Sequence, residues 1–210
     1  MQVNILCLLV LFMTGCTVNL PFNHRMSYSS VGEIKNIPHS QQEPISVQWI
    51  PPSFPERIDI QGASGFVGGA SQTRIPTGVG LSNRIIEALD VAIGINNRST
   101  RHLSISIINT ENRFEYSAGF FNVTPAIDVG QCILEAEFTF ADKHWKETFT
   151  ASEKDPTIGG TSQTGILEKV WDKIAVQVAR SVLSHLEENT LPRSQHSSPS
   201  TSAPLASPQP

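Results

Sequence analysis

The stretch Gln131-Cys-Ile-Leu-Glu-Ala-Glu-Phe-Thr-Phe140, followed closely by Trp145-Lys-Glu-Thr-Phe-Thr150, decides the fold of this chain. Apolar and polar side chains alternate along both segments, which is typical of β-strands that bury one face and leave the other in water. The four residues between them, Ala141-Asp-Lys-His144, suit a tight turn. We therefore predict an antiparallel hairpin over 131–150, with Glu135 and Glu137 on its wet face.

Two segments outside the hairpin have the period of amphipathic helices. One is expected over 81–93, with Ser82 as its N-cap and Gly94 at its end. The other is expected over 165–188, where large apolar residues recur every fourth position: Ile166, Val170, Ile174, Val178, Val182 and Leu186. Burying each large apolar side chain contributes about 1.5–3 kcal/mol, so the long helix must dock on a sheet or on a partner.

Further strands are indicated by alternation over 45–50 and 102–109, and a short one over 57–61. Phe114, Tyr116 and Phe120 suggest another, whereas the Gly- and Ser-rich segment 62–80 is interpreted as a long loop. Helices on one face of a mainly antiparallel sheet make an α+β fold. We expect one such domain over 45–190, with two helices packed on one face of the sheet.

The first residues have the features of an export signal. Residues 5–13 are nine apolar residues, too few for a membrane span of about 20 and typical of a signal peptide. The next motif, Met13-Thr14-Gly15-Cys16, resembles the lipobox of bacterial lipoproteins. This resemblance implies that a signal peptide over 1–15 is removed and that Cys16 carries acyl chains, palmitate among them. Several chains anchor a protein stably where one is marginal.

The resemblance also implies a location in the cell. Thr17, rather than Asp, follows Cys16, which for such lipoproteins points to the outer membrane, with the protein facing the periplasm. The alternative is an ordinary signal peptide that is cut near Gly15 and leaves Cys16 free. We expect a polar tether over 16–44, which has few apolar residues. We expect a disordered Pro- and Ser-rich tail over 191–210, because that segment cannot bury enough surface to offset its ordering entropy. The whole order of elements resembles the YajG-like small envelope lipoproteins and the lipoprotein partners of ABC-type envelope transporters.

Composition and motifs argue against several kinds of chemistry. With 19 acidic and 15 basic side chains in 210 residues, the chain lacks the basic excess of nucleic-acid-binding proteins. Three cysteines do not make a disulfide scaffold, and Cys132 is interpreted as a buried small hydrophobe rather than as a catalytic thiol. The histidines, His102 and His144 among them, lack metal-ligand spacing. The glycines of 62–80 lack the lysine of a phosphate loop, so we predict no catalytic, cofactor or metal site.

Glu135 and Glu137 lie about 7 Å apart by strand geometry, a spacing that suits acid–base chemistry. The simpler interpretation is a solvated outer face, with Glu147 nearby on the neighbouring strand. The function we predict is a non-enzymatic, lipid-anchored lipoprotein that binds an envelope partner through an open sheet edge or the Gly-rich loop. The alternatives are an auxiliary transport or secretion subunit that carries apolar cargo between the long helix and the hairpin, and an envelope hydrolase.

Overall fold

The computed structural model describes residues 17–19, 21–40, 42–50, 58–61, 72–115, 127–156 and 160–187. The expected signal peptide over 1–15, Cys16 and the expected tail over 191–210 lie outside the described residues. So do Tyr116 and Phe120.

The main sheet has four strands in the order β2-β5-β6-β7. They are β2 (Ser46–Ile50), β5 (His102–Glu115), β6 (Ile127–Phe140) and β7 (Lys143–Pro156). Strands β5, β6 and β7 are antiparallel as expected, but β2 runs parallel to β5, so the sheet is mixed. Two short strands and a helix separate β2 from β5 in the chain, and a crossover of this length allows parallel pairing.

The predicted hairpin is confirmed and is longer than expected. Strands β6 and β7 pair from Ile127 opposite Pro156 to Phe140 opposite Lys143, and the turn contains Ala141 at a positive φ of 53°. Burial alternates at nearly every position of β6. Strand β5 also extends past 109 through a bulge after Ile107, so Phe114 belongs to this strand and not to a separate one.

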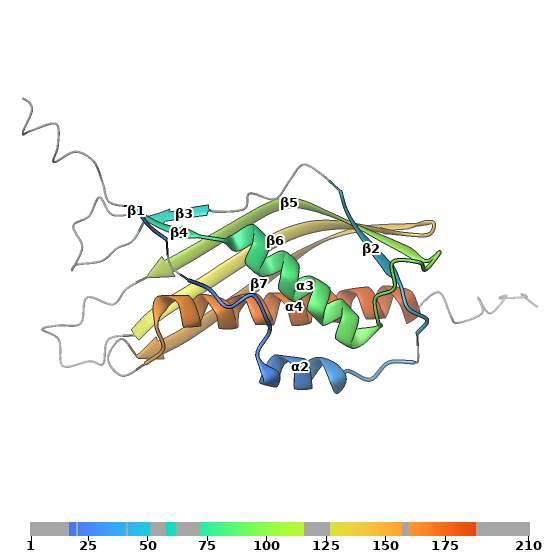
Figure 1. Ribbon diagram of the computed structural model, residues 1–210, viewed down its shortest axis with the longest axis horizontal. Coiled ribbons are helices and arrows are strands. Elements are labelled where there is room, and N and C mark those ends of the chain that lie inside the picture. The colour runs from blue at the N-terminus through green and yellow to red at the C-terminus, as the bar shows by residue number, and fades with distance from the viewer. Residues whose placement is uncertain are drawn as a thin grey trace, which may run out of the picture.

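Two long helices cover one face of the main sheet (Figure 1). Helix α4 (Gln163–Glu187) packs on β6 and β7, and α3 (Thr77–Ala92) packs beside α4. The helix layer and the sheet meet closely, because a Cβ atom placed on Gly130 would lie 2.7 Å from Ile166 Cγ2. The apolar face predicted for the long helix is thereby confirmed as its sheet-facing side.

A second, three-stranded sheet lies at one end of the long axis (Figure 1). Its order is β1 (Thr17–Asn19), β4 (Gln72–Ile75) and β3 (Ile58–Gln61), with β1 parallel and β3 antiparallel to β4. The short strand expected over 57–61 is thus present as β3.

The loop expected over 62–80 is wrong in its second half, which holds β4 and the first turn of α3; residues 62–71 lie outside the described part. Helix α3 starts at Thr77 without a side-chain N-cap, so the prediction of Ser82 as its cap is also wrong. The sequence does not indicate a helix start at Thr77, because Gly78 and Gly80 follow it and glycine is a weak helix former. Gly80 is required by packing, since a Cβ there would lie 2.5 Å from Trp171 Cζ3.

A third helix, α2 (Tyr28–Lys35), lies inside the segment 16–44 that was expected to be a polar tether. It packs on α3 and α4, and Ile34 at its core side has no exposed surface. Phe22 and Met26, just before it, are also buried. Three apolar side chains therefore dock a segment whose composition is otherwise polar, and the described residues form three helices where two were expected.

Candidate functional site

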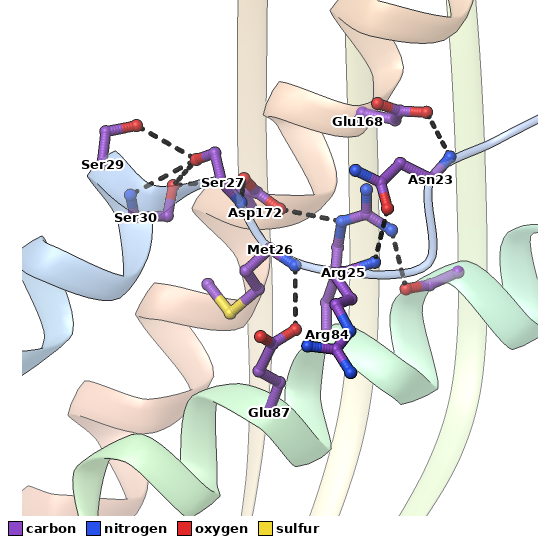
Figure 2. A network of polar contacts seen from close by, with 11 residues as sticks. Asn23, Arg25, Met26, Ser27, Ser29, Ser30, Arg84, Glu87, Glu168 and Asp172 are labelled. Atoms are coloured by element: carbon purple, nitrogen blue, oxygen red, sulfur yellow. Dashed lines mark hydrogen bonds and ion pairs between the residues drawn. The ribbon is translucent and has the colours of Figure 1, made fainter.

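A network of buried and half-buried polar groups lies beneath residues 22–27, which we call the strap. The strap crosses α3 and α4, and carboxylates of those helices accept hydrogen bonds from its backbone N–H groups (Figure 2). The three pairs are Asn23 N with Glu168 Oε1 at 2.6 Å, Met26 N with Glu87 Oε2 at 2.9 Å, and Ser27 N with Asp172 Oδ2 at 2.9 Å. The acidic side chains of the helices thus hold the strap by its main chain.

A buried ion pair joins α3 to α4 at the same place. Arg84 Nε donates to Asp172 Oδ1 at 2.8 Å, and the two side chains are 1% and 5% exposed. Arg84 Nη1 also donates to the carbonyl oxygen of Gly80 at 3.2 Å, and Ser30 Oγ donates to Asp172 Oδ2 at 3.2 Å. A buried pair is maintained only when such further hydrogen bonds offset the desolvation of both charges.

Trp171, which has no exposed surface, links this ion pair to the rest of the core. The Arg84 guanidinium carbon lies 5.4 Å from the Trp171 ring centroid, and Phe22 of the strap stacks on the ring at 5.0 Å. Trp171 Nε1 donates to Asn112 Oδ1 at 2.9 Å, and Asn112 Nδ2 donates to Thr77 Oγ1 at 3.0 Å. One connected network therefore joins the strap, both long helices and strand β5.

The charged groups of the network contact other groups of the protein and hold a chain segment in position. Both carboxylate oxygens of Asp172 accept hydrogen bonds from protein groups, and Arg84 is almost wholly enclosed. An open depression of about 650 Å³ lies beside the strap. Its two helix carboxylates are already engaged, since Glu87 accepts from Met26 N and Asp90 Oδ1 accepts from Ile95 N at 2.8 Å. The chemical capacity of this region is to hold the strap in place.

Cys132 is buried, as predicted from its place in the strand pattern. Burial raises the pKa of its thiol to about 12, with a smaller opposing effect from a hydrogen bond with Thr110. At neutral pH the side chain is therefore a protonated thiol inside the core, whereas a nucleophilic cysteine requires a thiolate.

The carboxylates predicted on the wet face of the hairpin each contact a lysine or histidine side chain of β7. Glu135 Oε1 lies 2.6 Å from Lys146 Nζ, and Glu137 Oε1 lies 2.7 Å from His144 Nε2. Glu147 is not beside them, because it pairs with Ala136 and faces α4, where it accepts a hydrogen bond from Ser181 Oγ. Glu147 is thus on the neighbouring strand, as expected, but on the opposite face of the sheet from Glu135 and Glu137.

His102 lies at the start of β5, where His102 Nδ1 is 2.5 Å from Ser46 Oγ of β2. His144 also contacts Thr139, so both histidines take part in contacts between neighbouring strands. Within the described residues, no group of three His, Cys, Asp or Glu side chains is placed to hold a metal ion. No helix in the part that the structure describes is long and apolar enough to cross a membrane.

Cys16 precedes the first described strand by one residue. Strand β1 begins at Thr17, whose Cα pairs with that of Gln72 in β4. The sequence-based reasoning missed this pairing, and it missed the Arg84–Asp172 pair and the strap. The available signal was a charged residue beside an apolar row in each helix, Arg84 before Ile85 and Asp172 after Trp171.

Comparisons with known proteins find resemblance only in outline. No protein-family model matches the chain, and no curated protein matches it. A minor lipoprotein from Acinetobacter baumannii has a TM-score of 0.40 and 10% identity over 71% of this chain and 96% of its own. A protein from Xanthomonas campestris has a TM-score of 0.38 and 13% identity, and the match covers 84% of this chain and 100% of that protein. The rare lipoprotein B from Shewanella oneidensis has a TM-score of 0.35 and 10% identity, and the match covers 70% of this chain and 96% of that protein. With every TM-score below 0.5, these likenesses assign the chain to no family.

Proposed function

We propose that this chain is an envelope lipoprotein that is held at the outer membrane by acyl chains on Cys16 and acts by binding a protein partner, without catalysis. The observation that carries the proposal is the motif Met13-Thr14-Gly15-Cys16, which ends one residue before β1. A lipid-modified cysteine at this point joins the membrane directly to the folded domain.

Binding, rather than catalysis, agrees with the state of the reactive side chains. Burial raises the pKa of the Cys132 thiol to about 12, and Glu135 and Glu137 contact Lys146 and His144 on an open strand face. The buried charges Arg84 and Asp172 are used to fasten the strap. A hydrolase needs convergent titratable groups that can reach a substrate in a cleft, and none of these groups meets that need.

The alternative of an apolar cargo between the long helix and the hairpin is disfavoured by the packing there. Gly130 of β6 lies against Ile166 of α4, so closely that even a methyl group would not fit without movement. Leu134 and Phe138 of β6 and Ile174 of α4 have no exposed surface. Side chains of the sheet and of the helix thus contact each other directly where the cargo was expected.

The contact surface for the partner is, in our proposal, the edge of β7, an outer strand of the main sheet. Gln177 Nε2 donates to the carbonyl oxygen of Thr150 at 3.1 Å, and Lys173 Nζ donates to that of Ser152 at 2.8 Å, so side chains of α4 cover this part of the edge. A depression of about 390 Å³ beside Thr148 adjoins the next part. An extended partner segment gains main-chain hydrogen bonds by pairing with such an edge.

Metabolic labelling with an alkyne-bearing fatty acid tests the anchor. Wild type and the matched control Cys132→Ala should incorporate the label and fractionate with outer membranes, and Cys16→Ala should not. Equal labelling of Cys16→Ala, or a soluble mature chain with a free N-terminal thiol by mass spectrometry, would refute the proposal.

Site-specific photocrosslinking in intact envelopes tests the edge of β7. A photoreactive residue at Thr148 should yield a discrete crosslinked protein, whereas the same residue at Ser152, where Lys173 covers the edge, should not. Crosslinks at Ser152 alone would place the partner elsewhere.

A further inference from the structure

No flexible segment separates the proposed lipid anchor, Cys16, from the first strand of the folded domain. Consecutive Cα atoms are about 3.8 Å apart, and Thr17, the residue after Cys16, is already paired with Gln72 of β4. The polar tether that was expected to separate the lipid from the domain therefore does not do so at its beginning. This inference rests on the proposed acylation of Cys16 and adds the orientation that follows from it.

The three-stranded sheet that receives β1 lies at one end of the molecule (Figure 1). Strand β3 contacts β5, and α3, which follows β4 directly, begins next to Asn112 near the end of β5. The last pair of the hairpin, Ile127 opposite Pro156, is at this same end. We call this region the anchor end.

The hairpin turn at Ala141 and Asp142 lies at the opposite end of the long axis (Figure 1). Strand β7 connects the two ends without interruption over 14 residues. With a rise of about 3.3 Å per residue, its ends are roughly 40 Å apart. A probe on β7 thus reports a position along the axis that runs from the anchor end to the turn.

We propose that the anchor end is a membrane-contact surface, so that the domain lies with β1, β3 and β4 against the lipid bilayer and with its hairpin turn directed away from it. Two attachments fix β1 and the chain that follows it to the domain. The first is the pairing of β1 with β4, and the second is the strap, which the helix carboxylates and the buried Asp172 hold by its backbone.

One large apolar side chain of the described residues is exposed at the anchor end. Ile127, at the start of β6, is 45% exposed. Two cations of this region are in ion pairs, with Arg113 Nε 2.7 Å from Glu111 Oε1 and Lys169 Nζ 3.4 Å from Asp155 Oδ2, whereas Lys154 of β7 is exposed. The contact is tested on neutral lipid at low and at high salt, because high salt screens attraction between exposed charges.

Fluorescence quenching on vesicles tests this orientation. Lys154→Cys and Asp142→Cys place single reactive thiols at exposed positions near the two ends of β7. Cys132 is buried with a raised thiol pKa and does not compete for the dye, and the acylated sulfur of Cys16 is blocked. The purified lipoprotein is labelled with bimane and inserted into phosphatidylcholine vesicles that contain a nitroxide on the headgroup of a fraction of the lipids.

Bimane at position 154 should be quenched several-fold more strongly than bimane at position 142, at both low and high salt. Equal quenching at the two positions, stronger quenching at 142, or no quenching at either would overturn the orientation. Mass spectrometry of the same samples establishes acylation separately. Loss of the lipid would refute the proposed function, whereas an acylated protein with the wrong quenching pattern would refute only the orientation.

A linker variant tests the cause of the orientation. Twenty Gly and Ser residues inserted between Cys16 and Thr17 leave β1 intact but add a flexible chain with an end-to-end distance of about 25 Å. Quenching at position 154 should then fall to the level at 142, with acylation retained. Unchanged quenching at 154 would show that direct attachment of β1 to the anchor does not hold this end at the membrane.

Discussion

Removal of the Asp172 carboxylate should be among the most destabilising single changes in this protein. In Asp172→Ala the guanidinium of Arg84, 1% exposed, loses its counter-ion and stays enclosed. Ser27 N and Ser30 Oγ lose their acceptor as well. Breaking one side of a buried ion pair costs about 3–5 kcal/mol, because the remaining charge is left without compensation. That is a large share of a domain's total stability of about 5–15 kcal/mol.

A double substitution separates the cost of an unpaired charge from the worth of the pair. Arg84→Met with Asp172→Leu removes both charges and keeps apolar volume against Trp171. Replacing a buried pair in this way is often neutral or stabilising. We therefore expect the free energy of unfolding of the double variant to be within about 2 kcal/mol of the wild-type value and well above that of Asp172→Ala.

Urea titration gives the free energies of unfolding, and limited trypsin digestion reports on the strap. Arg25 is exposed on the strap, and cleavage there requires local release from Asp172 and Glu87. Cleavage after Arg25 should be several-fold faster in Asp172→Ala than in wild type, because it tracks the population of the released strap. If Asp172→Ala lowers the free energy of unfolding by less than about 1 kcal/mol and leaves the rate of cleavage after Arg25 unchanged, the network does not hold the strap.

Three further predictions concern packing, pH and the buried thiol. Gly130→Ala should lower the free energy of unfolding, measured by urea titration, by about 1–3 kcal/mol, because its Cβ would lie 2.7 Å from Ile166 Cγ2. The control Gly32→Ala, with nothing within 4 Å of the new Cβ, should be neutral or stabilise α2 by about 0.5–1 kcal/mol. Equal effects of the two substitutions would contradict the packing described. Hydrogen bonds from Thr161 lower the pKa of Asp155, and Lys169 adds to this effect. The stabilisation is therefore present above the unfolded pKa of about 3.9 and disappears as pH falls through the lower folded pKa. Asp155→Asn should have a smaller free energy of unfolding than wild type at pH 6, and the difference should vanish in acid. A difference that does not depend on pH would rule out this origin. Cys132, with its thiol pKa raised to about 12, should react with a thiol reagent at pH 8 only on unfolding in urea, and prompt reaction of the native protein would show that the thiol is not enclosed.

The hairpin and the long helix could be predicted from the sequence because their patterns are local. In β6 the face of each side chain follows from its neighbours two positions away, which placed Glu135 and Glu137 outside and Cys132 inside. The apolar rows of α4 are likewise visible within one segment. The same period of two puts Glu147 on the face of Trp145 and Phe149, toward α4.

The strap, the Arg84–Asp172 pair and the pairing of β1 with β4 were decided only by the tertiary structure. Arg84 and Asp172 are 88 positions apart in the chain, and Ser27 and Asp172 are 145 apart. No periodicity within a segment records such a partnership, because each charge is acceptable in the interior only once the other arrives with its hydrogen bonds. From the sequence alone the chain after Cys16 has the composition of a tether; its few apolar side chains become anchoring points only where α3 and α4 together form a surface to receive them.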